Sequence, residues 1–454
     1  YGSKALSITG EGNVVIDGEG QGRLFNVASA ANVNKLSLNN LILTGGDAYY
    51  GSIIYSYAKE LILENISMIN NPTSGNLITN NGKLTINKSK FANNTCGDII
   101  KSAGNYDITI TNSTFENNTV TGSSSDYGIV YISSGRGNLV VEDSRFINNT
   151  ARQGVLIGSS DTNIDVKGCD FIDNTNTVAY GGAIRASSQL NVVDSIFINN
   201  KALKDGGAIY IGFRGEATVT KSVFIDNAVT SNGYYGDAIY NGNKLSVNYC
   251  VLLSNGTRHV IYNDGEDNVV NAQYNWWGTN DDPSSLNGAG EYEDDDDYDV
   301  PCADVDSSNW VVMTVSNNLT DEINVGDKVE FTVDFTHTNN GQVLADSIPE
   351  IDVSASALYG QMDAQEAITA NNVVKFVYTA VEGGEDSVTI TSSNAVNVTS
   401  ISVKVPVVLE VIYVSMSGDD NNNGARDTPV ATLKHAIEIA EKGKIVIMNG
   451  DYTI

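Results

Sequence analysis

The sequence predicts an all-β protein: a right-handed parallel β-helix of about ten coils, then an immunoglobulin-like β-sandwich and the capped start of a second β-helix. Three observations support this fold class. An apolar pattern repeats at the length of one coil, an asparagine recurs at one place in that repeat, and the composition suits strands. The chain has 43 Gly but only 6 Pro, and 18% of its residues are charged, which is typical of strands joined by short turns.

The repeat consists of two apolar residues one position apart, followed by a third apolar residue five positions later. Leu84 and Ile86 followed by Phe91 are one example, and the pattern occurs nine times in succession, at intervals of 23 to 31 residues. Because side chains alternate along a strand, each coil should add one apolar layer to a continuous core. The third residues are Leu43, Met68, Phe91, Phe115, Phe146, Phe171, Phe197, Phe224 and Leu252.

An asparagine stands three residues beyond each of these apolar residues from Met68 onward. Identical amides stacked coil on coil can bond to one another along the axis, and asparagine tolerates the left-handed turn conformation. We therefore expect an asparagine ladder. Its members are Asn71, Asn94, Asn118, Asn149, Asn174, Asn200, Asn227 and Asn255.

Two other repeat folds are alternatives to the β-helix. A leucine-rich repeat has a similar period, but it needs several leucines per unit and usually a helical segment, and neither occurs here. A β-propeller blade needs about 40 residues or more, which is longer than these units. The β-helix is therefore the favoured fold.

A second strand is expected later in each coil, where a small apolar pair follows a glycine-containing turn. The residue after each pair should point outward, and in four successive coils it is Arg185, Tyr210, Tyr240 and Tyr262. Stacked aromatic rings with polar tips could hold sugar rings or a partner protein. The alternative is ordinary stacking between coils that stabilises the sheet.

Three domains follow from changes in the pattern along the chain. Residues 1–300 form the β-helix, which ends in a cap containing Trp276 and Trp277 and an acidic linker, where calcium binding is an alternative. Residues 301–410 alternate like a sandwich of about 100 residues. Residues 411–454 should contain a strand, an amphipathic helix and a second strand, which begin another β-helix.

The helix of the third domain has predicted boundaries. Thr428 is expected to cap it, Pro429 fits its first turn, and Gly443 ends it. Its apolar stripe is expected to consist of Leu433, Ala436, Ile437 and Ala440.

Charge and cysteine content narrow the possible functions. The formal net charge of −29 makes nucleic acid an unsuitable partner, because phosphate binding needs clustered Lys and Arg. Residues 1–454 contain no apolar run of 18 residues, so no membrane span is expected in this segment. Cys96, Cys169, Cys250 and Cys302 have no paired or metal-binding spacing and are interpreted as free.

The sequence contains only weak candidates for a catalytic or metal-binding site. The acids Asp173 and Asp226 are two coils apart, and the three histidines have no metal spacing, so no catalytic residue, enzyme activity or cofactor is expected. Asp419, Asn421 and Asn423 match half of a calcium loop, but the twelfth position is Val430 rather than glutamate.

The chain also contains nine Asn-x-Ser/Thr sequons, which are candidate glycosylation sites. They are Asn65, Asn87, Asn93, Asn112, Asn117, Asn148, Asn255, Asn318 and Asn397.

A family resemblance rests on ordered motifs. Phe-Ile-Asn-Asn at 197–200 and Gly-Gly-Ala-Ile-Tyr at 206–210 resemble repeats of polymorphic outer-membrane-type β-helix proteins. Together with Asn-Trp-Trp-Gly at 275–278, the sandwich, and the motif from 412 to 424, the chain looks like the adhesin-like surface proteins of methanogenic archaea. That resemblance implies a secreted protein with pectate-lyase-like architecture and no catalytic residues to carry over.

The expected role is therefore attachment at the cell surface, outside the cell. The partners would be other cells, surface glycans or proteins. Two rival functions remain, a carbohydrate-active enzyme of the polysaccharide lyase type and a filament subunit assembled head to tail through the β-helix ends. The residues are also expected to be one segment of a longer tandem chain.

Overall fold

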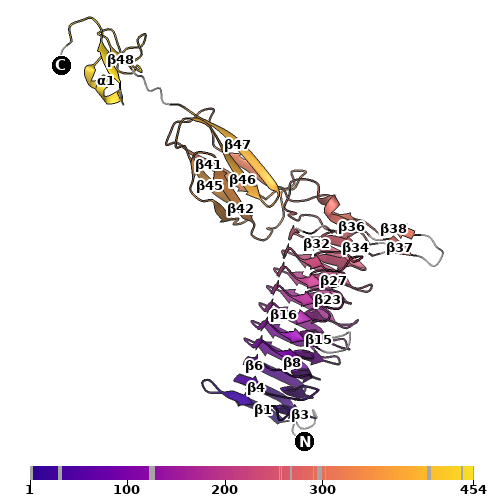
Figure 1. The fold of residues 1–454 in the computed structure, drawn as a ribbon. Coiled ribbons are helices and arrows are strands. Elements are labelled where there is room, and N and C mark those ends of the chain that lie inside the picture. Colours follow the sequence, from indigo (N-terminus) through magenta and orange to yellow (C-terminus); the bar gives the residue numbers. More distant parts are fainter. Residues whose placement is uncertain are drawn as a thin grey trace.

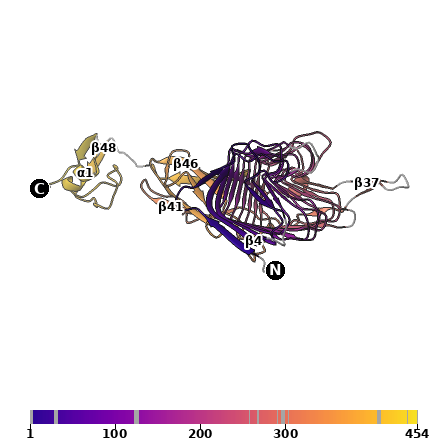
Figure 2. The same cartoon turned by 90° about the horizontal axis from the view of Figure 1, so that it is seen from below.

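A computed structural model describes residues 4–28, 33–121, 128–254, 256, 258–265, 268–289, 291–293, 299–301, 303–405, 411–440 and 443–452. Its first part is a parallel β-solenoid of about ten turns over residues 4–289, followed by small antiparallel sheets (Figure 1). Seen from below in Figure 2, the strands of successive coils lie over one another. The predicted fold class is confirmed.

The coils build three parallel sheets within the described residues, here called sheets A, B and C. Each coil runs through sheet A, in most coils then sheet C, and then sheet B before it returns one level higher. The strands of sheet A are β1 (Lys4–Thr9), β2 (Val15–Asp17), β4 (Val33–Thr44), β6 (Glu60–Ile69), β8 (Lys83–Asn87), β9 (Lys90–Ala92), β12 (Ile108–Thr111), β13 (Thr114–Glu116), β16 (Asn138–Glu142), β17 (Arg145–Ile147), β20 (Asn163–Lys167), β21 (Asp170–Ile172), β24 (Gln189–Val193), β25 (Ile196–Ile198), β28 (Glu216–Thr220), β29 (Val223–Ile225), β32 (Lys244–Asn248), β33 (Val251–Leu253), β35 (Val270–Asn271) and β39 (Val305–Asp306).

Sheets B and C contain shorter strands. Sheet B consists of β3 (Phe25–Val27), β5 (Ile54–Ser56), β7 (Ile78–Asn80), β11 (Ile100–Ser102), β15 (Val130–Ile132), β19 (Leu156–Ile157), β23 (Ile184–Ala186), β27 (Ile209–Ile211), β31 (Ile239–Asn241), β34 (Ile261–Asn263) and β36 (Asn287–Ala289). Sheet C consists of β10 (Thr95–Cys96), β14 (Thr119–Val120), β18 (Thr150–Ala151), β22 (Thr175–Asn176), β26 (Lys201–Ala202) and β30 (Ala228–Val229).

The repeating apolar residues are vertical neighbours in the core, as predicted. Phe91 stacks on Phe115 with ring centroids 4.6 Å apart and planes 5° apart. Four further pairs continue the stack to Phe224 at 4.7 to 5.0 Å. All six rings are fully buried, so one phenyl ring per coil fills the interior.

The asparagine ladder is also present, and its described members are buried. The Nδ2 atom of Asn149 donates to Oδ1 of Asn174 at 3.0 Å and to the carbonyl of Phe115 at 2.9 Å. Its Oδ1 atom accepts from both the backbone N–H and Nδ2 of Asn118. Equivalent amide bonds link all described members from Asn71 to Asn227. Asn255 lies outside the described residues.

The left-handed conformation belongs to the residue before each ladder asparagine, not to the ladder asparagine itself. Asn117 and Asn148, for example, have φ of 53° and 50°. The ladder residue must place its amide inside the coil, so the preceding residue makes the corner and remains exposed. Our expectation on this point was wrong by one position.

Two of the cysteines belong to a second ladder that sequence inspection did not resolve. The backbone N–H of Ser113 donates to Oγ of Ser144 in the next coil at 3.1 Å. In later coils Cys169 and Cys250 occupy the position equivalent to these serines. Cys96, Cys169 and Cys250 are free and buried, and Cys302 lies outside the described residues.

The two adjacent tryptophans close the upper end of the β-helix. Trp277 packs in the β-helix core, whereas Trp276 is fully buried in the sandwich core and meets Phe335 edge to face at 5.0 Å. Lys221 of the β-helix also pairs with Asp346 of the sandwich at 2.7 Å. The sandwich therefore docks on the last coils and covers the apolar end.

Two strands flank the predicted acidic linker. The acidic residues 294–297 lie outside the described residues, but β37 (Glu291–Glu293) and β38 (Asp299–Pro301) on either side pair as an antiparallel hairpin. The chain then returns to sheet A, where β39 pairs with β35. The β-helix thus extends beyond residue 300, past a short 3₁₀ helix η1 (Pro283–Leu286) and this hairpin.

The second domain consists of two four-stranded antiparallel sheets around one core that contains Phe331, Phe376 and Ile390. The first sheet has β40 (Thr314–Asn317), β41 (Lys328–Asp334), β45 (Val373–Thr379) and β43 (Gln361–Met362). The second has β44 (Glu366–Ile368), β42 (Asp352–Ala357), β46 (Gly384–Ser392) and β47 (Ala395–Val403).

The last segment has the predicted order of strand, helix and strand, with a shifted helix. β48 (Val411–Val414) pairs in parallel with β49 (Lys444–Ile447), and α1 spans Leu433–Ile439.

The predicted helix cap at Thr428 is wrong. Thr428 donates to Oδ1 of Asn423, and Val430 bridges to β48 in extended conformation. The carboxylate of Asp420 accepts the N–H groups of Ala431 and Thr432, which places the cap at Thr432, whose Oγ1 accepts from the amide of the third helical residue.

The predicted apolar stripe of α1 is also only partly buried. Ala436 is fully buried, but Ile437 is 61% exposed.

Asn149→Ala should lower the free energy of unfolding by about 3 kcal/mol or more, because it removes two donated bonds and leaves the partners of Oδ1 unsatisfied in the core. Asn148→Asp is the matched control, since its side chain is exposed and Asp occupies the same corner at Asp173, and it should cost under about 0.5 kcal/mol. Urea denaturation of both variants measures this. Equal stability of the Ala variant and the parent would contradict the ladder.

Asp98 should make stability depend on pH. Its carboxyl is buried, its Oδ2 has no hydrogen-bond partner among the described residues, and burial raises its pKa to about 8. Because the folded pKa is raised, this group's contribution is greatest below about pH 4, the unfolded value, and is lost as the pH rises to about 8.

Asp98→Asn should therefore raise the melting temperature at pH 9 much more than at pH 5. Thermal melts with the exposed Glu142→Gln variant as charge control measure this. A pH-independent difference would show that Asp98 does not titrate in this range.

Candidate functional site

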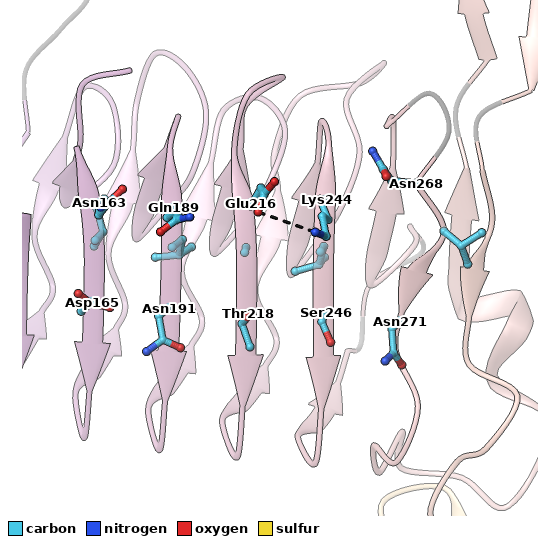
Figure 3. Close-up of a pocket in the computed structure, with 15 residues that line it drawn as sticks. Asn163, Asp165, Gln189, Asn191, Glu216, Thr218, Lys244, Ser246, Asn268 and Asn271 are labelled. Carbon is cyan, nitrogen blue, oxygen red and sulfur yellow. Dashed lines mark ion pairs between the residues drawn. The ribbon is translucent and has the colours of Figure 1, made fainter. Parts of the chain in front are cut away.

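A groove of about 630 Å³ crosses the outer face of sheet A over the last coils (Figure 3). Strands β20, β24, β28 and β32 form its floor, and the segment before β35 closes one end. Its polar lining is Asn163, Asp165, Gln189, Asn191, Glu216, Thr218, Lys244, Ser246, Asn268 and Asn271.

Strand alternation produces two parallel rows of outward side chains. In β24, Leu190 and Val192 point into the core while Gln189 and Asn191 point outward. Parallel register then places residues of one row directly above each other. The first row contains Gln189, Glu216 and Lys244, and the second contains Asp165, Asn191, Thr218, Ser246 and Asn271.

Several polar groups in the middle of the groove have no partner within the described residues. Within the described residues, the side chains of Asp165, Gln189, Asn191 and Thr218 make no hydrogen bond or ion pair. On the same face of earlier coils some outward side chains pair with one another, as where Asn87 donates to Glu64 at 2.9 Å. Unpaired donors and acceptors are available to a polar ligand.

Asp165 and Glu216 are the two carboxylates that line the groove. Asp165 and Glu216 lie two strands apart and in different rows, so two strand spacings alone separate them by about 9.6 Å. Paired carboxylates that hydrolyse a glycosidic bond lie about 5 to 9.5 Å apart. Glu216 also faces Lys244 at 3.8 Å.

The weak metal candidates use their oxygens within the loop. Oδ1 of Asp419 accepts from Asn421 at 2.8 Å, and Oδ1 of Asn423 accepts from Thr428. In the part of the chain that the structure describes, no three His, Cys, Asp or Glu side chains come together in a way that could hold a metal ion.

The predicted stripe of Arg185, Tyr210, Tyr240 and Tyr262 lies on sheet B, away from the groove. Its register is as expected, and the rings of Tyr210 and Tyr240 stack with centroids 5.1 Å apart. The stripe is not an open surface, however, because Tyr210 and Tyr240 are only 9% and 6% exposed.

Loop residues cover this stripe. The ring of Tyr180 lies 4.6 Å from that of Tyr210, and the ring of Tyr235 lies 4.3 Å from that of Tyr262. The hydroxyl of Tyr240 donates to the carboxylate of Asp264. Burial raises the pKa of Tyr210 to about 12. The ligand-binding role of the four side chains stays a prediction.

Eight of the nine sequon asparagines lie in described residues. Six are exposed and two, Asn87 and Asn397, are half-buried, while Asn255 is outside the described residues. The exposed ones are Asn65, Asn93, Asn112, Asn117, Asn148 and Asn318. Glycosylation stays a prediction.

Sequence inspection missed the groove because it followed apolar positions. The signal was present at the outward residue of each long strand, which is Thr85, Thr109 and Val140 in three early coils and Asp165 and Asn191 in the next two. A change from β-branched to amide and acid side chains at one repeat position marks the start of the groove.

The coils, the ladder and the outer polar face define a parallel β-helix protein with a polar groove on its outer face. The family described as a right handed beta helix region matches residues 3–171 and 104–274. The chain therefore belongs to the right-handed β-helix family. No curated protein and no solved structure matches it. No helix among the described residues is long and apolar enough to cross a membrane.

Tyr210→Ala should lower the free energy of unfolding by about 3 kcal/mol while saccharide binding stays unchanged, because the ring is buried in a stack far from the groove. Tyr359→Ala, which removes a ring that is 58% exposed, is the control. Urea denaturation and a saccharide-binding titration distinguish a structural role of the tyrosine stripe from a ligand-binding role. Lost binding with unchanged stability would restore the stripe as the ligand site.

Proposed function

We propose that this chain is a non-enzymatic adhesin or envelope protein that attaches cells to glycans through the groove of sheet A. The observation that carries this proposal is the set of unpartnered side chains at Asp165, Gln189, Asn191 and Thr218. Sugar hydroxyls both donate and accept, so amide, hydroxyl and carboxylate groups arranged along a concave surface suit them.

The architecture supports presentation of that groove. About ten coils at about 4.8 Å each make a rod near 50 Å long. The sandwich docks on its end through Trp276 and Lys221, and it lies beside the coils that carry the groove. A rigid face next to a docked sandwich suits attachment to a partner.

The proposed place is the cell surface, outside the cell. The resemblance to adhesin-like surface proteins of methanogenic archaea supports this, and the partners would be other cells, surface glycans or proteins. The net charge of −29 disfavours nucleic acid. A polysaccharide lyase is the first rival.

A head-to-tail filament is the second candidate function. Exposed apolar side chains favour it, since Val15 in the first coils is 54% exposed and Met416 in the last module is 63% exposed. Ordered fibres in micrographs of the purified chain would support this function over attachment.

The double variant Gln189→Ala/Asn191→Ala should weaken glycan binding by about tenfold or more, because two amide side chains are lost from the groove. Lys83→Ala/Thr85→Ala is the matched control, since these residues occupy the same positions of β8 below the groove. Glycan arrays followed by titration calorimetry provide the measurement. Binding that survives in the groove variant, or release of unsaturated or reducing sugar ends, would overturn the proposal.

A further inference from the structure

Five tyrosine rings, here called the tyrosine stack, form one continuous series beside sheet B. The ring centroids of Tyr180 and Tyr210 lie 4.6 Å apart, and those of Tyr210 and Tyr240 lie 5.1 Å apart. The series continues from Tyr240 to Tyr262 at 6.0 Å and from Tyr262 to Tyr235 at 4.3 Å. Centroid separations of this size are typical of aromatic pairs in contact. Because electron tunnelling weakens steeply with distance, rings in contact exchange an electron quickly.

The tyrosine stack connects a buried phenol to the solvent. Tyr235 at one end is 42% exposed, whereas Tyr240 in the middle is only 6% exposed. A bulky oxidant in solution can therefore touch Tyr235 but not the face of Tyr240. Exposed tyrosyl radicals disappear by pairing with one another, and a ring inside the protein does not meet a second radical. Tyr240 is thus the place in the stack where a radical would last.

Tyr240 also has a base for its proton. Its hydroxyl donates to the carboxylate of Asp264. An oxidised phenol is a strong acid, so a phenol is oxidised more easily where a base within hydrogen-bond reach accepts its proton. The same pair therefore provides a hole for the electron to leave and an acceptor for the proton.

A second buried tyrosine provides an internal comparison. The hydroxyl of Tyr378 in the sandwich donates to the carboxylate of Asp386 at 2.7 Å, and its ring is fully buried. Within the described part of the sandwich, the ring of Tyr378 stacks on no other aromatic ring. Tyr240 and Tyr378 share burial and a carboxylate, but only Tyr240 belongs to a stack that reaches the surface.

We propose that the tyrosine stack is a redox-active relay, and that Tyr240 holds the oxidising equivalent. The substrate class is a one-electron oxidant that meets the protein at Tyr235. The electron passes from Tyr240 through the rings of Tyr262 and Tyr235 to the oxidant, which is reduced by one electron. The phenol proton moves to the carboxylate of Asp264, so the products in the protein are a neutral tyrosyl radical and a carboxylic acid. This activity is independent of the groove on sheet A.

Rapid mixing of the full chain with tris(bipyridine)ruthenium(III), followed by freeze-quench electron paramagnetic resonance, tests the proposal. This cationic one-electron oxidant is attracted by the net charge of −29. The parent should show a long-lived fraction of the tyrosyl radical signal. Tyr240→Phe should abolish that fraction, because phenylalanine preserves the stack but has no phenol. Tyr378→Phe is the matched control and should leave it unchanged.

Two further variants test the proton acceptor and the route. Asp264→Asn should slow radical formation at Tyr240 by about a hundredfold or more, because an amide accepts a hydrogen bond but does not take the proton. Tyr180→Leu/Tyr262→Leu should also slow it, since this double variant removes the rings that join the buried pair to the surface. Thermal melts should show that the variants stay folded.

A parent without a long-lived radical, or a Tyr240→Phe variant that retains it, would overturn the proposal. An equal loss in Tyr378→Phe would also overturn it, because burial and a carboxylate would then be enough without the stack. Unchanged kinetics in both Asp264→Asn and Tyr180→Leu/Tyr262→Leu would contradict the relay as well. If the double variant did not fold, Tyr240→Phe and Asp264→Asn would still decide.

Discussion

The fold depends on the register between coils, and the buried asparagine ladder is the interaction that imposes it. Each ladder amide, such as that of Asn149, bonds to the coil above, the coil below and the backbone. A slip of one residue would leave all of these groups unpaired in a dry interior, at a cost of several kcal/mol per coil. The phenyl rings from Phe91 to Phe224 stack in the same register and add apolar contacts between coils. Polar and apolar requirements therefore select one alignment.

That alignment also creates the candidate site. No single coil contains a groove, because each long strand contributes only two or three outward side chains. Parallel stacking turns these side chains into rows, and a change of residue type at one position becomes a continuous surface. The row from Asp165 to Asn271 shows this, since its neighbours come from different coils but share one face. Function in this architecture follows from register rather than from a local motif.

Two adjacent tryptophans close the end of the solenoid, and each packs in the core of a different domain. Trp277 completes the β-helix core, and Trp276, the residue before it, is buried against Phe335 of the sandwich. Adjacent residues point to opposite sides of an extended chain, so one dipeptide can serve two cores. The sandwich thus acts as the cap and protects the strand edges of the last coil. It is also the module that lies beside the groove.

The sequence predicted what repeats and missed what occurs once. The apolar pattern and Asn71 to Asn227 identified the coils because every unit repeats the same requirement. Burial of Tyr210 and Tyr240 could not be predicted, since loops of variable length contribute Tyr180 and Tyr235 and have no period. The helix cap moved to Thr432 because Asp420, twelve residues earlier, fixes the local backbone. Such contacts depend on tertiary structure.

The most direct test of the coil register is a distance between spin labels at Lys83→Cys and Lys244→Cys. Both positions are exposed and belong to one row of sheet A, six coils apart, so their backbones should lie about 29 Å apart. Pulsed electron resonance should give a narrow distribution near that value. A broad distribution, or one centred far from it, would contradict the stacked coils on which the groove depends.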